Sequence, residues 1–262
     1  MLVADDHPVN RLVLQALLER LGHRCHLAAD GEQALAALRA TRFDLVLMDV
    51  HMPVLDGVGA TRALRALPPP AGTTPVLALT ADVFPDTRTR CLDAGVQEVL
   101  TKPLSLDGLS AVLARHLGVV APGPAVLMPL DTATDAARPT GGATAALIDR
   151  SAVDGVRQLV GADRMPALYS GFFEQARDAG RRMRDAMRTA DPEALARAAH
   201  GVKGAALNLG LPALADVAAR LSRDAATLSA APLAGAVQQY EDLVDATHRF
   251  CIDEGLLAGS LV

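Results

Sequence analysis

The sequence contains no tryptophan, and aromatic residues make up only 3% of its 262 residues. It also has no cluster of lysine and arginine, and its formal net charge is −5. Nucleic-acid-binding surfaces need a basic patch or stripe that follows the phosphate backbone. We therefore expect no direct binding to nucleic acid.

Long apolar runs are missing as well. No segment approaches the roughly 18 consecutive apolar residues of a membrane span. Met1 is followed directly by LVADD, without the basic stretch and apolar core of a signal peptide. We expect a cytoplasmic chain without direct membrane contact of its own, or a piece of a longer protein that is tethered to the membrane elsewhere.

Cysteine is scarce and scattered. Cys25, Cys91 and Cys251 are odd in number and have no C-x-x-C spacing. A disulfide framework and a structural zinc site both need paired cysteines at short, regular spacings. We expect all three cysteines to be reduced packing residues.

The chain is long enough for about two domains at roughly 150 residues each, and 50% of it is hydrophobic, which is ample for packed cores. Residues 119–146 are rich in proline, alanine, threonine and glycine and keep neither a helical nor a strand period. This composition predicts a flexible linker. It separates residues 1–118 from residues 147–262.

The two parts have different hydrophobic patterns. In residues 1–118, five short strand-like runs alternate with helical ones, which predicts a doubly wound α/β domain with a five-stranded parallel sheet. In residues 147–262 no strand signal remains and 3.6-residue periods predict an all-α antiparallel bundle. Its expected core stripes are Met165, Leu168 and Phe172; Leu214, Val217, Leu221 and Leu228; and Leu233, Val237, Tyr240 and Val244.

Polar side chains follow four of the predicted strands. Asp5 and Asp6 come after the first strand, Asp49 ends the third, Thr80 ends the fourth, and Lys102 follows the fifth. The carboxyl ends of parallel strands meet at one edge of the sheet, where ligands gather. An aspartate pair at one strand end more often only caps the next helix, but four strand ends that supply such groups favour a site.

The chemistry of these groups favours phosphoryl transfer. Three neighbouring carboxylates repel one another unless a cation neutralises them, and oxygen ligands suit Mg²⁺. A lysine and a hydroxyl facing that ion form a cradle for phosphate oxygens. We expect Asp49 to be the nucleophile.

The segments LVADDHPVNR, FDLVLMDVHMPVLDG, LALTAD and LTKPL resemble the receiver domain of response regulators over about residues 1–118. The resemblance implies a flavodoxin-like fold in which Asp49 is the phosphoacceptor. It also implies that Asp5 and Asp6 hold Mg²⁺ together with Asp49 and the backbone carbonyl of His51.

By the same resemblance, Thr80 and Lys102 sense the acyl phosphate, and the Lys102–Pro103 peptide is cis. Val99 departs from the family pattern, because an aromatic residue usually stands three positions before the lysine. We interpret His7 and His51 as rim residues of the pocket. Phosphatases with an aspartate nucleophile need an acid two residues later, where this chain has His51, so that reading is disfavoured.

A second chemical motif lies in residues 189–221. Asp191 predicts a helix N-cap with Pro192 in the first turn, and Gly210 closes this helix before Pro212 opens another. Leu195, Val202 and Leu209 form its expected core stripe, whereas His200, Lys203, Gly204 and Leu207 share a separate face. Glycine inside a helix costs about 1 kcal/mol relative to alanine, so Gly201 and Gly204 indicate a close approach by a partner.

The segment AHGVKGAALNLG resembles the histidine phosphotransfer (HPt) domain, and this likeness covers about residues 147–255. The resemblance implies that His200 carries a phosphoryl group. A neutral imidazole is a nucleophile near pH 7, Lys203 one turn later attracts phosphate oxygens, and Gly204 makes room for a docking partner.

Together these features predict a phosphorelay protein, plausible as the C-terminal part of a hybrid sensor kinase. The hypothesis runs from a kinase histidine, in a separate protein or upstream in the same polypeptide, to Asp49, then to His200, and then to the receiver of a downstream response regulator. The sequence has no glycine-rich nucleotide loop, so ATP is not expected as a direct donor. The alternatives are a docking scaffold that is not phosphorylated and a C-terminal fragment that regulates a kinase.

Overall fold

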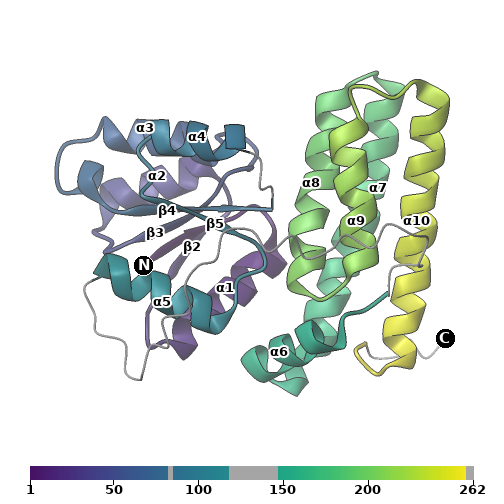
Figure 1. Ribbon diagram of the computed structural model, residues 1–262, viewed down its shortest axis with the longest axis horizontal. Helices are drawn as coiled ribbons and strands as arrows, with labels where there is room; N and C mark the ends of the chain where they lie inside the picture. The colour runs from purple at the N-terminus through teal and green to yellow at the C-terminus, as the bar shows by residue number, and fades with distance from the viewer. Residues whose placement is uncertain (82–84, 118–146, 258–262) are drawn as a thin grey trace.

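The structure is a computed structural model that describes residues 1–81, 85–117 and 147–257. Its N-terminal part is an α/β domain and its C-terminal part is a helical bundle, and the two lie against each other (Figure 1). The predicted linker, residues 119–146, lies outside the described residues. Among the described residues, no helix combines the length and apolarity needed to cross a membrane.

A parallel sheet forms the centre of the α/β domain. Its strands are β1 (Leu2–Ala4), β2 (His26–Ala28), β3 (Val46–Asp49), β4 (Val76–Thr80) and β5 (Glu98–Thr101). They lie side by side in the order β2-β1-β3-β4-β5, and every neighbouring pair is parallel. The predicted five-stranded, doubly wound sheet is confirmed. The order reverses beside β1, so the carboxyl ends of β1 and β3 flank the place where such sheets bind ligands.

Helices cover both faces of this sheet. One face packs against α1 (Pro8–Arg20) and α5 (Leu106–Leu117), and the other against α2 (Gly31–Ala40), α3 (Gly57–Arg65) and α4 (Pro85–Asp93). Successive strand residues alternate between the two cores, as the period of a strand requires: Leu47 belongs to the first and Met48 to the second. A single turn of 3₁₀ helix, Ala71–Thr73, precedes β4.

The C-terminal domain consists of helices, as predicted. They are α6 (Arg150–Val160), α7 (Met165–Arg188), α8 (Pro192–Asn208), α9 (Pro212–Asp224) and α10 (Ala230–Asp253), with a 3₁₀ turn at Ala162–Arg164. The expected core stripes are buried with one exception. Leu228 is 39% exposed, because α9 ends at Asp224 and the residue falls in the turn before α10. The core stripe predicted from the sequence therefore runs beyond the end of α9.

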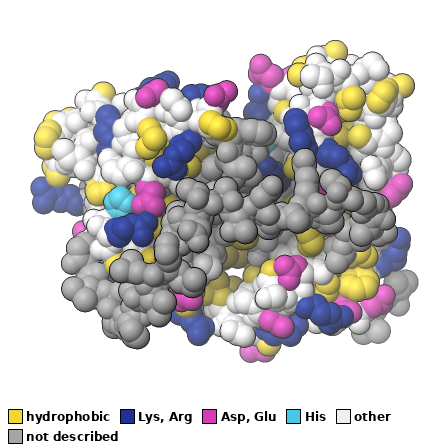
Figure 2. All heavy atoms as spheres, viewed as in Figure 1, with side chains coloured by type: hydrophobic (Ala, Val, Ile, Leu, Met, Phe, Trp, Pro, Cys, Tyr) yellow, Lys and Arg dark blue, Asp and Glu magenta, His cyan; other side chains and the backbone are white. Residues whose placement is uncertain are grey.

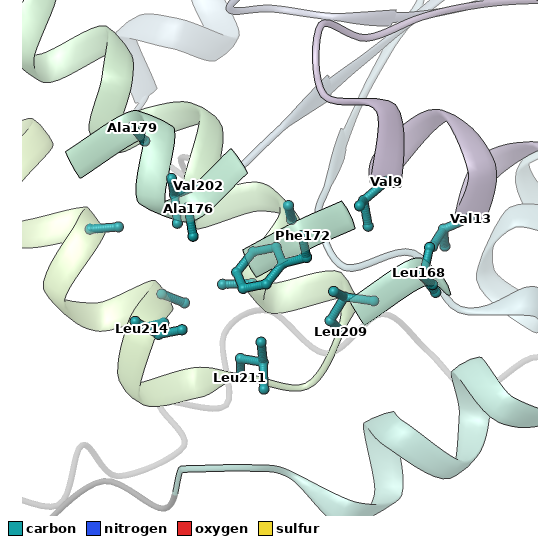
Figure 3. Close-up of a cluster of buried hydrophobic side chains, with 14 of the residues drawn as sticks. Val9, Val13, Leu168, Phe172, Ala176, Ala179, Val202, Leu209, Leu211 and Leu214 are labelled. Atoms are coloured by element: carbon teal, nitrogen blue, oxygen red, sulfur yellow. The ribbon is translucent and has the colours of Figure 1, made fainter. Parts of the chain in front are cut away.

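The two domains share a hydrophobic core cluster. It runs from the sheet through Val9 and Val13 of α1 into Leu168 and Phe172 of α7 (Figure 3). Helix α1 also contacts α6 and α8. A second hydrophobic core lies between the sheet and helices α2, α3 and α4. It contains residues of the α/β domain alone. The bundle therefore docks on the face of the α/β domain that carries α1.

The surface outside this contact is mixed in charge. On the face drawn in Figure 2, lysine and arginine side chains are interspersed with aspartate and glutamate side chains. No large patch of a single charge sign stands out on this face.

Candidate functional site: an acidic pocket facing a histidine

The three predicted metal-binding carboxylates lie together at the carboxyl edge of the sheet. Asp5 and Asp6 follow β1 directly and Asp49 is the last residue of β3, its neighbour in the sheet. One carboxylate oxygen from each lies within 4.8 Å of the others. Asp5 and Asp49 are buried and Asp6 is partly buried. Oxygen donors at this spacing, with side chains held by strand ends, fit a divalent cation such as Mg²⁺.

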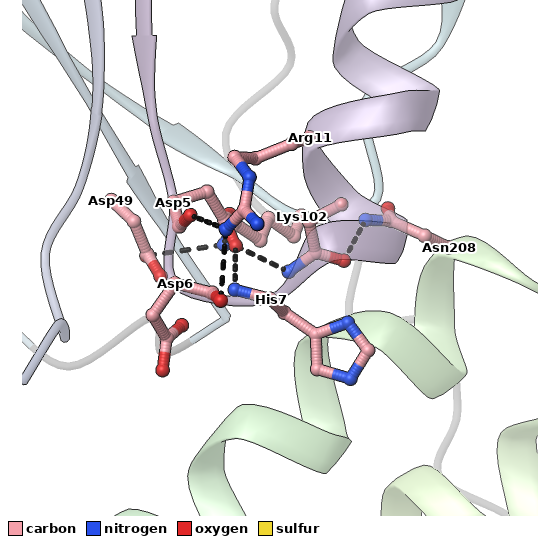
Figure 4. A network of polar contacts seen from close by, with 8 residues as sticks. Asp5, Asp6, His7, Arg11, Asp49, Lys102 and Asn208 are labelled. Atoms are coloured by element: carbon pink, nitrogen blue, oxygen red, sulfur yellow. Dashed lines mark hydrogen bonds and ion pairs between the residues drawn. The ribbon is translucent and has the colours of Figure 1, made fainter. Parts of the chain in front are cut away.

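Lys102 enters the same pocket from the end of β5. Its Nζ donates to Asp5 Oδ2 at 2.7 Å and lies 3.1 Å from Asp49 Oδ1 (Figure 4). The Lys102–Pro103 peptide is cis, as predicted. Thr80 ends β4 opposite Thr101 of β5 and is 1% exposed. The structure thus brings the side chains of all four predicted strand ends to one edge.

The pocket has strong electrostatic coupling. Burial, opposed by the Lys102 ammonium and reinforced by Asp5 and Asp6, raises the pKa of Asp49. Burial and the neighbouring Asp5 carboxylate raise the pKa of Asp6 to about 6. Burial lowers the pKa of Lys102, but the carboxylates of Asp49 and Asp5 outweigh it and hold that pKa above its ordinary value. The carboxylates resist ionising together, so they favour an added cation.

The loop around Asp5 and Asp6 is held by Arg11, for which the sequence predicted no role, and by the backbone N–H of His7. Arg11 Nη1 donates to the carbonyl of Asp5 at 2.6 Å and to that of Asp6 at 2.9 Å. The backbone N–H of His7 donates to Asp5 Oδ1 at 2.9 Å. Arg11 follows the motif by one helical turn, and only the folded loop shows that its guanidinium turns back onto the strand end.

His7 and His51 both lie at the pocket, as the sequence predicted. His7 is 6% exposed, and its burial lowers its pKa to about 4, so its imidazole is neutral at pH 7. Its ring centroid is 6.3 Å from that of Phe172 in α7. His7 is therefore enclosed between the domains rather than on an open rim.

His200 faces the acidic pocket from the other domain. Its ring centroid lies 4.1 Å from that of His51, two residues after Asp49. His200 sits in the middle of α8, which begins at the predicted cap, where Asp191 accepts a hydrogen bond from Ala194 N–H at 2.9 Å. Lys203 follows one turn later and is partly buried. His200 of the bundle therefore lies beside His51, at the end of the sheet that carries the acidic cluster.

Two glycines of α8 lie against the α/β domain. A Cβ atom on Gly204 would lie 3.5 Å from Asn10 Nδ2 and 3.7 Å from Lys102 Cδ. A Cβ atom on Gly201 would lie 4.0 Å from Asp6 Oδ2. The sequence predicted a close approach at these glycines, and the neighbour that approaches is the receiver-like domain of the same chain.

A cavity of about 780 Å³ lies between the domains beside the two histidines. Its lining includes Asp6 and His51 from the α/β domain, and Arg182, His200 and Gly201 from the bundle. The space next to His200 is therefore bordered by both acidic and basic groups.

The sequence predicted no role for two asparagines that lie at the domain contact. Asn10 in the first turn of α1 is 2% exposed, and its Oδ1 accepts a hydrogen bond from Asn208 Nδ2 at 2.9 Å. Both residues lie inside the motifs that carried the family resemblances. Their pairing depends on how two separate domains dock, which no local pattern of one sequence reports.

Comparison with protein families assigns both domains. Residues 1–114 match the response regulator receiver domain, and residues 167–250 match the Hpt domain. The chain is a receiver domain followed by an Hpt domain. This pair of domains belongs to phosphorelay signal transduction, as the sequence predicted.

Curated relatives contain the same stretch within much longer proteins. The sensor histidine kinase AruS of Pseudomonas aeruginosa is 34% identical over 229 residues, which is 86% of this chain and 21% of that protein. The sensory/regulatory protein RpfC of Xanthomonas campestris pv. campestris is 33% identical over 232 residues, 85% of this chain and 30% of that protein. The chain thus spans less than a third of the length of either relative.

Among solved structures, the receiver domain of a sensor histidine kinase from Pseudomonas aeruginosa PAO1 is 42% identical. The match covers 45% of this chain and 96% of that one, with a TM-score of 0.42. That receiver was solved with a magnesium ion coordinated in its active site cleft.

Proposed function

We propose that this chain passes a phosphoryl group between its own two domains. Asp49 accepts it from the phosphohistidine of a histidine kinase, His200 takes it from Asp49, and a downstream receiver takes it from His200. The observation that carries this proposal is the contact between the ring of His200 and that of His51, two residues after Asp49 in the chain. The two rings are tilted by 51° with centroids 4.1 Å apart. This proximity supports an attack by His200 on an aspartyl phosphate at Asp49.

The transfer step balances with the groups present. The unprotonated ring nitrogen of His200 attacks the phosphorus, a P–N bond forms, and the P–O bond to the Asp49 carboxylate breaks. The carboxylate is the leaving group, and the other ring nitrogen releases its proton to solvent afterwards. Lys102, already within 3.1 Å of Asp49, offsets the negative charge on the transferring oxygens.

The acidic cluster would hold Mg²⁺ through Asp5, Asp6 and Asp49, with the carbonyl of His51 as the further ligand that the family resemblance implies. Bound there, the ion supplies positive charge against the phosphoryl oxygens. Thr80 and Lys102 contact the phosphoryl group, and Lys203 attracts it toward His200. Partners of this chemistry are a kinase phosphohistidine, in a separate protein or upstream in the same polypeptide, and a second receiver aspartate.

The proposal is tested on the full chain with a labelled small acyl phosphate and Mg²⁺. Hydroxylamine cleaves an aspartyl phosphate, whereas a phosphohistidine survives base and breaks down in acid. We expect both kinds of label in the unaltered chain, hydroxylamine-sensitive label alone in His200→Gln, and none in Asp49→Asn. An unaltered chain that takes up no label would support a docking scaffold, and acid-labile label in Asp49→Asn would show that His200 is loaded independently.

A further inference from the structure

A chain of hydrogen bonds joins the Hpt domain to the acidic pocket. Asn208 Nδ2 donates to Asn10 Oδ1 at 2.9 Å, and Asn10 Nδ2 donates to Asp5 Oδ1 at 3.0 Å. Lys102 Nζ binds the other oxygen of the same carboxylate at 2.7 Å (Figure 4). The Asn10 amide thus donates through Nδ2 within the receiver and accepts through Oδ1 across the domain contact.

The position of Asn208 separates it from the reacting atoms. It is the last residue of α8, eight residues after His200, which is about 12 Å along the helix axis at 1.5 Å per residue. Gly201, Gly204 and Asn208 recur at helical spacing and all approach the receiver. The amide pair therefore holds the far end of the docked face while His200 lies at its middle.

We infer that Asn208 is a positioning residue, with Asn10 as its acceptor, and that this pair determines which receivers the Hpt domain accepts. Since helix ends are free to rotate and slide on an apolar contact, a directional bond at Asn208 fixes the register of α8 over Asp49. A receiver with an aliphatic side chain at the Asn10 position would leave the Asn208 amide without its acceptor, which opposes docking. The inference rests on the proposed transfer between Asp49 and His200.

The experiment isolates the transfer step in the full chain. His200 is first phosphorylated with labelled phosphoramidate, which modifies histidine, in the presence of a chelator. The reagent is removed, Mg²⁺ is added, and the loss of acid-labile, hydroxylamine-resistant label reports transfer to Asp49. The variants are Asn208→Ala, Asn10→Ala and the double substitution, with Asn208→Asp as an isostere that lacks the donor. Gln238→Ala is the matched control, because its amide bonds to Asp242 on the exposed side of α10.

We expect Asn208→Ala to slow transfer roughly tenfold, the size expected for losing a partly buried hydrogen bond. Asn208→Asp should be slower still, because its carboxylate would face the Asn10 carbonyl oxygen. In the Asn10→Ala background, the Asn208 substitution should have no further effect, which a merely structural role would not produce. Labelling of Asp49 by a small acyl phosphate should be the same in Asn208→Ala, Gln238→Ala and the unaltered chain.

Two results would overturn the inference alone: transfer at the unaltered rate in both Asn208 variants, or equal slowing by Asn208→Ala with and without Asn10. If the unaltered chain does not transfer label to Asp49 at all, the proposed function fails and takes this inference with it. Circular dichroism of each variant shows whether a slow rate comes from lost helix rather than lost register.

Discussion

At the scale of single residues, Lys102 is the group that makes the acidic pocket compatible with folding. It binds Asp5 and Asp49, two buried carboxylates that repel each other. A buried charge is tolerated only when it is paired. Asp6, the most accessible of the three carboxylates, has no ion pair with Lys102 in the described part of the chain. Its pKa is raised first by burial and then by repulsion from the Asp5 carboxylate. An added cation would relieve it.

The first prediction is that phosphorylation of Asp49 depends on a divalent cation. Asp49 should take up label from a small acyl phosphate only with a divalent cation, and excess chelator should abolish it. Asp6→Asn should raise the Mg²⁺ concentration for half-maximal labelling by roughly tenfold or more, because even groups outside the ligand set commonly change metal affinity 10–100-fold. Asp44→Asn is the matched control, since Asp44 is exposed and remote from the pocket. Unchanged labelling in chelator would contradict a metal-dependent site.

The second prediction concerns Gly204. The space above it admits a methyl group at ordinary contact distance, 3.5 Å from Asn10, but not a longer side chain. Gly204→Ala should keep near-normal transfer and stabilise α8 by up to about 1 kcal/mol. Gly204→Leu should slow transfer at least tenfold, in line with about 1–3 kcal/mol for overpacking. Transfer rates and thermal unfolding measure the two effects.

Gly171→Leu serves as the control for that series. An added Cβ there meets nothing within 4 Å, so the same change of residue type in a helix should leave transfer intact. Normal transfer in Gly204→Leu would show that the glycine is not needed for the approach of α8 to the receiver.

At the scale of elements, two tyrosines fix the bundle in comparable ways. Tyr169 of α7 donates its hydroxyl to the Leu209 carbonyl at 2.6 Å, and Tyr240 of α10 donates to the Ala176 carbonyl at 2.8 Å. Both side chains are fully buried. The first bond holds the end of α8, one residue beyond Asn208, whereas the second joins α10 to the middle of α7.

The third prediction uses this pair. Tyr169→Phe should lower the free energy of unfolding by about 1–2 kcal/mol, because the Leu209 carbonyl lies past the end of α8 and loses its hydroxyl donor. Tyr240→Phe should lower it by about 1 kcal/mol, because the Ala176 carbonyl lies inside α7 and keeps the donor of the helix ladder. Tyr169→Phe should in addition slow phosphoryl transfer between the domains, whereas Tyr240→Phe should not. Denaturant unfolding and transfer kinetics on the same samples test this. Equal transfer rates in the two variants would show that the end of α8 needs no support from α7.

The elements themselves could be predicted from the sequence, and their docking could not. The strands are short apolar runs, the helices have a clear period of 3.6 residues, and the cap at Asp191 is a local signal. Val9 and Val13 lie in α1, and nothing local in the sequence indicates that they share a core cluster with Phe172. Asn10 is a polar residue in the first turn of a helix, yet it is 2% exposed and bonds both Asp5 and Asn208 of the other domain. The acidic pocket was predictable since its members follow strand ends.

At the scale of the whole molecule, each domain contains one fully buried thiol. Cys91 lies in α4 of the receiver and Cys251 in α10 of the Hpt domain, and both are free and 0% exposed. Burial raises the pKa of Cys251 to about 12 and also raises that of Cys91. Cys25, before β2, is only partly buried. The expectation of reduced packing cysteines is confirmed for the two buried ones.

The fourth prediction is an order of thiol reactivity. In the native chain near pH 8, an alkylating reagent should modify Cys25 first, and Cys91 and Cys251 only through opening of their domains. The thiolate is the reactive form, so raising the pH toward the raised pKa values should speed the buried thiols. Mass spectrometry of digested samples separates the three sites. Rapid alkylation of Cys251 in the native chain would contradict the packed α10.

The hydrophobic cluster that joins α1 to α7 also constrains how the two domains can change during evolution. In a free receiver, the outward side of α1 would tolerate many substitutions, whereas here Val9 and Val13 are buried together with Leu168 and Phe172. A change on one side of such a contact is accepted when the other side changes with it. The two domains of this lineage should therefore show correlated substitutions between α1 and α7, and a receiver exchanged for one from another kinase should dock only if the matching bundle surface is exchanged with it.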